Sequence, residues 1–180
     1  MDWMEDIRKK SARKNRLMFS RESAFLEDLS LCIAQQSHRT LVLWALDLAK
    51  ETVDRLETKY PGEYRPRNAL RAAEDWAAGR IKMPIAQRKI LTCHALAREL
   101  SIAEDIALCH AVGQACSVVH TPRHALGYPI YDLTAIVFTL GVENCRDALV
   151  SRKQLYIDKL LFWQKSPACK SGSWAAFLRV

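Results

Sequence analysis

Apolar residues recur with the period of an α-helix along most of the chain. The clearest case is residues 38–60, where Leu, Val, Trp and Ala positions fill a broad arc of the helical circumference. The narrower polar arc carries Asp47, Lys50, Glu51 and Asp54. Such a broad apolar face predicts a helix with neighbours on more than one side, and Pro61-Gly62 should end it.

Proline, glycine and capping signals divide the rest of the chain into further helices. A second helix should begin near Pro66 and end at Gly79, and a third should begin near Pro84. Ser101 followed by Glu104 resembles a capping box, which would open a fourth helix. This fourth helix should cover 102–120. The other expected helical ranges are 22–35, 122–140 and 143–164, with a bend in 122–140 at Gly127 and Pro129.

No segment alternates apolar and polar residues over the length of a strand. The sequence therefore predicts an all-α fold, a single domain of about six to eight helices packed as helical hairpins or a bundle. We assign residues 22–165 to this domain and residues 1–21 to a basic N-terminal extension. Residues 166–180 form a C-terminal tail, which we expect to dock on the domain through Trp174, Phe177 and Leu178.

Composition is ordinary for a globular protein, with 49% hydrophobic and 26% charged residues and a net charge of +7. The six cysteines form no CxxC pair, and the first residues, MDWMEDIRKK, lack the apolar segment of a signal peptide. We expect a cytoplasmic protein with reduced thiols. The uncharged run 106–122 contains His, Gln and Gly and ends at a proline, so we interpret it as a buried helix and expect no membrane association.

Several short motifs occur in an order that is similar to one protein family. They are Leu43-Trp44-Ala45, Tyr60-Pro61, Arg65-Pro66-Arg67, Trp76 with Gly79, His94-Ala95, Ala97-Arg98-Glu99, and His120 followed by His124-Ala125-Leu126-Gly127. Over roughly residues 38–140 the chain resembles the helical, immunity-five-like immunity proteins of bacterial polymorphic toxin systems. The resemblance implies an all-α protein, not an enzyme, that binds and neutralises a cognate protein toxin. A basic chain would suit an acidic or neutral partner better than a basic one.

Cys116, His120 and His124 form the sharpest candidate for chemistry. On an unbroken helix, steps of four would place these ligand types on one face, as a zinc site requires. However, Pro122 falls between the histidines and no fourth ligand is evident, so we favour a structural role. His94 and His110 lack an accompanying nucleophile and carboxylate, which favours core or edge histidines over a general base. We expect no cofactor.

Charged side chains near the first long helix are candidates for partner binding. Asp47, Glu51 and Asp54 lie on its polar arc, where they would either be solvated or dock a partner. Arg65 and Arg67 could clamp an anion at the start of the second helix, or tie adjacent helices together through carboxylates. We favour the tie for the arginines, and keep all five residues as the predicted partner-binding set.

The basic segment 8–16, RKKSARKNR, supports an alternative function. It could bind nucleic acid, although it has no interleaved aromatic residue and the chain has no known nucleic-acid-binding module. A metal-dependent enzyme using the Cys116 motif is a less favoured alternative. The preferred hypothesis is an immunity protein, monomeric or homodimeric, that acts by covering the active site of a toxin.

Overall fold

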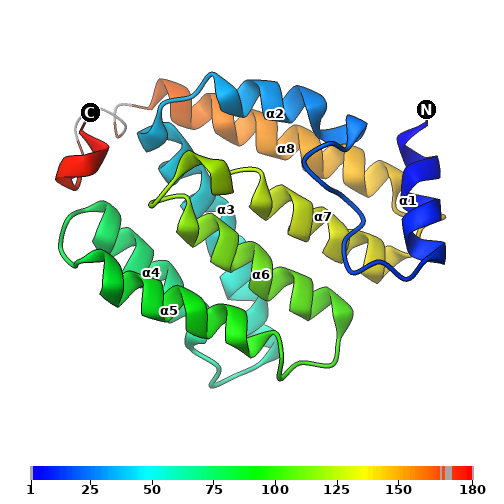
Figure 1. Ribbon diagram of the computed structural model, residues 1–180, viewed down its shortest axis with the longest axis horizontal. Coiled ribbons are helices and arrows are strands. Elements are labelled where there is room, and N and C mark those ends of the chain that lie inside the picture. Colours follow the sequence, from blue (N-terminus) through cyan, green and yellow to red (C-terminus); the bar gives the residue numbers. More distant parts are fainter. Residues whose placement is uncertain (1, 167, 169–171, 180) are drawn as a thin grey trace.

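The computed structural model describes residues 2–166, 168 and 172–179. The described residues fold into one all-helical body without strands, as predicted (Figure 1). Its eight α-helices are α1 (Trp3–Ala12), α2 (Glu27–Ala34), α3 (His38–Lys59), α4 (Arg65–Ala77), α5 (Met83–Leu96), α6 (Ala103–Ser117), α7 (Gly127–Leu140) and α8 (Arg146–Lys165). Three short 3-10 helices are η1 (Ala24–Leu26), η2 (Pro122–His124) and η3 (Ala176–Leu178).

Most helices begin and end near the predicted signals. Ser37 caps α3, because its hydroxyl accepts a hydrogen bond from the amide of Thr40 at 3.2 Å. After α3 the chain turns through Gly62, whose φ of 93° lies in the left-handed region that favours glycine. Pro66 and Pro84 lie in the first turns of α4 and α5, where proline costs no helical hydrogen bond.

The prediction of one bent helix over residues 122–140 was wrong. Pro122–His124 form η2, and α7 begins separately at Gly127. Pro129 therefore lies in the first turn of α7, where its missing N–H leaves no intrahelical bond broken.

The predicted capping box before α6 was also wrong. Ile102 is the N-cap residue, and no side chain caps this end of the helix. Glu104 instead forms an ion pair with Arg55 of α3. The Glu104 side chain therefore makes a tertiary ion pair instead of the local capping interaction that the sequence predicted.

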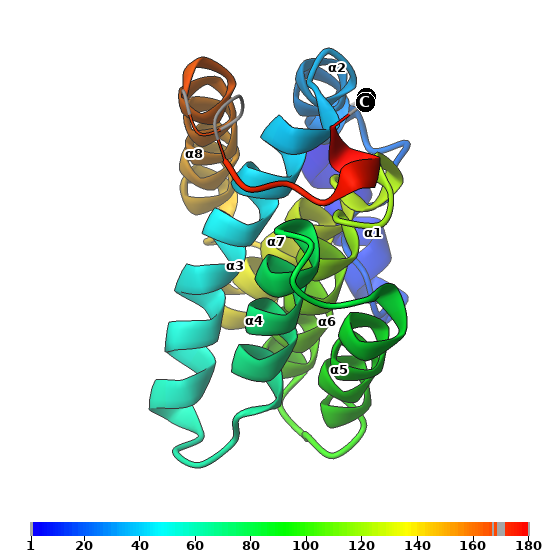
Figure 2. The same cartoon turned by 90° about the vertical axis from the view of Figure 1, so that its left-hand side faces the viewer.

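The helices α3 and α6 form the centre of the body. The helix α3 contacts α4, α6 and α8, while α6 also contacts α4, α5 and α7. Figure 2 shows α2 and α8 at one end of the molecule and the α4–α5 hairpin toward the other. Trp44 of α3 is completely buried, and its indole N–H donates to the backbone carbonyl of Tyr156 in α8 at 2.9 Å. The core thus joins helices that are far apart in the sequence.

The N-terminal segment 1–21 packs on this body over its described part. Met4 and Ile7 of α1 are buried, and so is Met18 in the linker that follows. The Met18 amide donates to the hydroxyl of Thr134 in α7 at 3.1 Å. The linker is therefore fixed along α7.

The C-terminal segment returns to the end of α4. Trp174 and Leu178 are buried, and the amide of Ala175 donates to the carbonyl of Ala77 at 2.7 Å. Phe177 of η3 packs against Trp76, with 5.8 Å between ring centroids. Residues 167, 169–171 and 180 of the predicted tail lie outside the described residues.

The uncharged run 106–122 lies mostly in the buried interior, as predicted. No helix among those described has both the length and the apolarity needed to cross a bilayer. The described cysteines form no disulfide with one another, and four of them are buried in the core: Cys93, Cys109, Cys116 and Cys145.

Candidate protein-interaction surface

Two of the predicted acidic residues on α3 are held by side chains of α8. Asp47 accepts hydrogen bonds from the ammonium of Lys159 at 3.0 Å and from the indole of Trp163 at 3.1 Å. Glu51 lies 3.1 Å from the guanidinium of Arg152. These carboxylates join α3 to α8, so they are not a row of free acceptors.

Asp54 and Arg67, both in the predicted partner-binding set, bind each other. The guanidinium of Arg67 lies 2.5 Å from Asp54 and 2.6 Å from Glu57, which ties α4 to α3. The hydrogen bond from Arg67 lowers the pKa of Glu57 below its usual value. The fork of Arg67 is therefore filled by carboxylates of the chain itself.

Arg65 is held in a similar way at the start of α4. Its guanidinium lies 2.6 Å from Glu63 and 2.6 Å from Glu99, a residue of the connection between α5 and α6. Hydrogen bonds from Arg65 lower the pKa of both carboxyl groups. An anion would have to displace a carboxylate to reach this site.

The structure separates the three residues of the predicted metal motif. Cys116 is completely buried in α6, and burial raises the pKa of its thiol. His120 stacks on Trp76 at 6.1 Å between ring centroids, and His124 Nδ1 lies 2.9 Å from Oε1 of Gln114. Because α6 ends before His120, the steps of four no longer share a helical face. In the described part of the chain, no three His, Cys, Asp or Glu side chains gather to hold a metal ion.

His94 and His110 form a hydrogen-bonded pair between α5 and α6. Their Nδ1 atoms lie 2.9 Å apart, so one ring donates and the other must be a neutral acceptor. Burial, and then the neighbouring His110, lower the pKa of His94 to about 4. Gly113 leaves room for this ring, because a Cβ there would lie 2.3 Å from it. The pair packs the α5–α6 interface.

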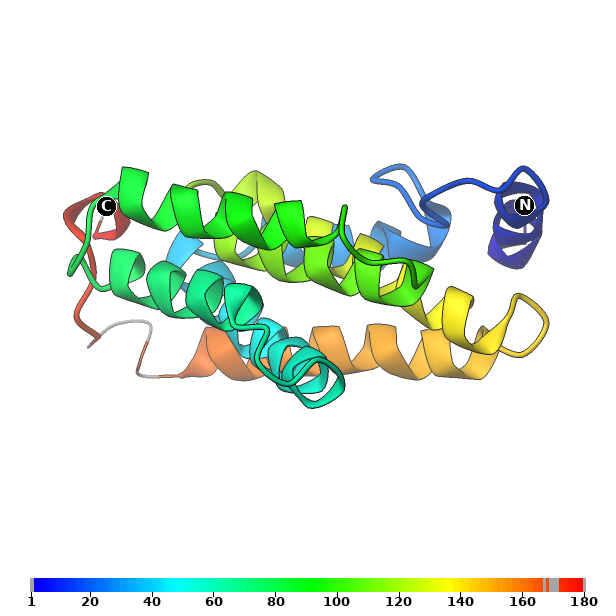
Figure 3. The same cartoon turned by 90° about the horizontal axis from the view of Figure 1, so that it is seen from below.

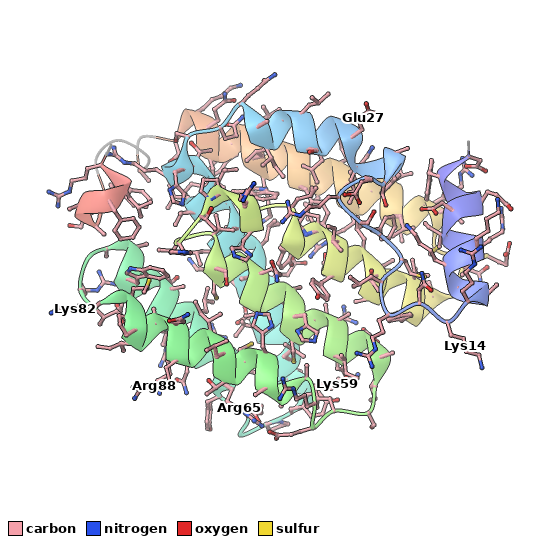
Figure 4. The ribbon with its side chains drawn as sticks, in the orientation of Figure 1. Lys14, Glu27, Lys59, Arg65, Lys82 and Arg88 are labelled. Carbon is pink, nitrogen blue, oxygen red and sulfur yellow. The ribbon has the colours of Figure 1, made fainter. Side chains whose placement is uncertain are left out.

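The outward face of α5 carries cations without acidic partners. Lys82, Arg88 and Lys89 are exposed, and Arg98 lies just after the helix. Among the described residues no carboxylate lies within 4 Å of any of these four cationic groups, and Figure 4 shows Lys82 and Arg88 pointing away from the body. The helix lies along one edge of the molecule (Figure 3). A partner could reach this face without rearranging the fold.

Apolar side chains are interspersed with these cations. Ile85 and Leu91 are 52% and 58% exposed, and Met83 at the start of the helix is 42% exposed. Only a narrow stripe of α5 faces the core. We call the exposed set, Lys82, Ile85, Arg88, Lys89 and Leu91, the α5 face. A mixture of exposed apolar groups and free arginine is typical of protein-binding surfaces.

The sequence held a signal for the α5 face that our prediction missed. No Asp or Glu occurs between Asp75 and Glu99, although this stretch contains several Arg and Lys residues. The described charges are mixed on α3 and α4, but not on α5.

The protein is an all-helical scaffold in which Arg65 and Arg67 are paired with carboxylates of the chain, whereas the cations of the α5 face have no carboxylate within 4 Å among the described residues. These features are those of a protein-binding protein. The chain belongs to the family described as Imm-5 like putative immunity protein, whose sequence profile matches residues 31–159. The match covers α3 to α7 and most of α8, and includes the whole α5 face. Neither a curated protein nor a solved structure matches the chain significantly.

Proposed function

We propose that this chain is an immunity protein that binds an acidic surface of its cognate toxin through the α5 face. Binding would neutralise the toxin by covering its active site. The observation that carries the proposal is the contrast in charge pairing. The acidic residues of α3 are engaged inside the fold, whereas Lys82, Arg88 and Lys89 have no carboxylate within 4 Å among the described residues.

The charges also define the chemistry of the partner. A cationic face attracts an acidic one and speeds the encounter, while the apolar side chains of the α5 face supply contact area once docked. This differs from the predicted set of Asp47, Glu51, Asp54, Arg65 and Arg67. Those side chains would have to break existing ion pairs to serve a partner.

A binding function without catalysis is supported by the surroundings of the histidines. Each of them bonds to another imidazole, to an amide or to a backbone carbonyl, or stacks on an indole. No described histidine has a carboxylate within 4 Å, so none forms the histidine–carboxylate pair of a catalytic triad.

Nucleic-acid binding by the basic segment 8–16 is less well supported. Arg8 pairs with Glu143 of the α7–α8 connection, while Lys9 and Lys10 pair with acidic residues one turn earlier in α1. Three of the six cations in the segment are therefore neutralised within the fold. A polyanion would meet a weaker field than the sequence implies.

The double variant Arg88→Glu/Lys89→Glu tests the proposed function. We expect it to weaken binding to the toxin domain encoded beside this chain by about 10- to 100-fold, because two attractive contacts become repulsive. Isothermal titration calorimetry with a catalytically inactive toxin domain measures the affinity. Growth on co-expression of the active toxin measures protection, which should be lost.

The matched control is Arg123→Glu/Lys165→Glu. Both residues are exposed, lie outside α5 and have no carboxylate within 4 Å among the described residues. Both double variants change the net charge by the same amount, so they differ only in where on the surface the charges are reversed. Equal affinity of the two double variants would contradict a role for the α5 face, and a wild-type chain that neither binds nor protects would contradict the immunity function.

A further inference from the structure

An apolar groove opens beside the end of α5. It has a volume of about 960 Å³ and lies between the linker after α1, the α5–α6 connection, α6 and α7. Its floor includes Ala103, Ile106, Ala107 and His110 of α6, with Tyr131 and Phe138 of α7 beside them. These α6 positions are spaced i, i+3, i+4 and i+7, so they form one continuous helical face.

The floor has the shape on which a further helix would pack. The helices α6 and α7 lie side by side and in opposite directions (Figure 1). The stretches 103–110 and 131–138 each extend over about 10 Å, since an α-helix rises 1.5 Å per residue. An amphipathic segment of about two turns matches this length. Recognition of this kind places apolar side chains at helical spacing into a groove between helices.

The rim of the groove is cationic. Lys14 and Arg16 come from the linker after α1, Arg98 comes from the α5–α6 connection, and no Asp or Glu lines the groove. None of the three has a carboxylate within 4 Å among the described residues, and all three are exposed. Figure 4 places Lys14 at the turn after α1. Charge complementarity therefore selects an occupant whose apolar face is flanked by carboxylates.

We propose that this groove receives an acidic amphipathic helical segment of the toxin, adjoining the contact made by the α5 face. This inference rests on the proposed function and adds a second anchor to it. Arg98 borders both the groove and the end of α5, so one partner could cover both without a gap. Lys14 and Arg16 lie outside the region matched by the family profile, so this part of the rim is a feature of the chain beyond the shared family region.

Ala103→Trp tests the groove directly. Ala103 is exposed at the first position of α6, so an indole there fills the groove without entering the core. We expect the affinity for the inactive toxin domain, measured by calorimetry, to fall at least tenfold. Arg16→Glu is the second variant, which reverses a rim charge on an exposed linker residue and should also weaken binding. Ala34→Trp, at the exposed end of α2 and outside the groove, should bind within about twofold of wild type.

The outcomes separate this inference from the proposed function. If the wild-type chain binds the toxin and Ala103→Trp binds equally well, the groove proposal is overturned while the immunity function stands. If the wild-type chain does not bind, both fail. Sedimentation velocity of the chain alone tests another occupant: a dimer that Ala103→Trp dissociates would show that a second copy, not a toxin segment, fills the groove.

Discussion

Replacing Asp132 by alanine is expected to lower the free energy of unfolding by about 3–5 kcal/mol. Asp132 of α7 is 4% exposed and accepts hydrogen bonds from Arg152 Nε at 2.7 Å and from the hydroxyl of Tyr156 at 2.5 Å. Without it, the guanidinium of Arg152 would stay largely buried, with only the exposed Glu51 as a carboxylate partner. Urea denaturation followed by circular dichroism measures the change.

Asp54→Ala is the matched control for this variant. It also removes a carboxylate from an arginine, but Asp54 is exposed and Arg67 keeps its contact with Glu57. We expect a change below about 1 kcal/mol, as for other solvent-exposed ion pairs. Equal losses for the two variants would show that burial of the Asp132–Arg152 pair does not control its contribution.

Acidification from pH 7 to pH 5 is expected to destabilise the fold by about 2 kcal/mol through His94. The pKa of this imidazole is about 4 in the folded chain, compared with about 6.5 when unfolded. The unfolded chain therefore binds the proton first, and stability is lost as the pH falls below about 6.5. The loss levels off as the pH falls through about 4, and well below this value His94 is protonated in both states. Above pH 7 His94 should have little effect.

The variant His94→Asn isolates this contribution. Urea denaturation at pH 7 and pH 5 should show a smaller loss in the variant than in the wild-type chain. Arginine contacts lower the pKa of Glu57, Glu63 and Glu99, so these three carboxyl groups stay ionised over this interval. Wild-type and variant curves with the same pH dependence would refute a depressed pKa at His94.

The sequence predicted the fold well because its helix signals are local. The broad apolar face of α3 and the prolines that open α4 and α5 each act within a few residues. One error, the capping box before α6, occurred where a distant contact competed with a local signal. Glu104 pairs with Arg55 instead of completing a capping box before α6, and this partner lies about fifty positions away in the chain.

The candidate surface was harder to predict for the same reason. Helical phase correctly placed Asp47 and Asp54 on the polar side of α3, but phase does not reveal which cations reach over from other helices. Lys159 contacts Asp47 from a position far along the chain. Unpaired charges can be recognised only after such ion pairs are known. For this reason the α5 face was identified from the structure, although the sequence already shows that no Asp or Glu occurs near it.

Arg65, Arg67 and Arg152 each contact two carboxylates and thereby connect separate elements of the fold. Arg65 bridges Glu63 and Glu99, Arg67 bridges Asp54 and Glu57, and Arg152 bridges Asp132 and Glu51. These ion pairs restrict the relative movement of α3, α4, α7 and α8. The pair between Arg65 and Glu99 also connects α4 to the segment that follows α5. We therefore expect the proposed docking surface to be largely preorganised. Association would sacrifice little conformational entropy in this chain, so most of the contact energy would be retained as affinity.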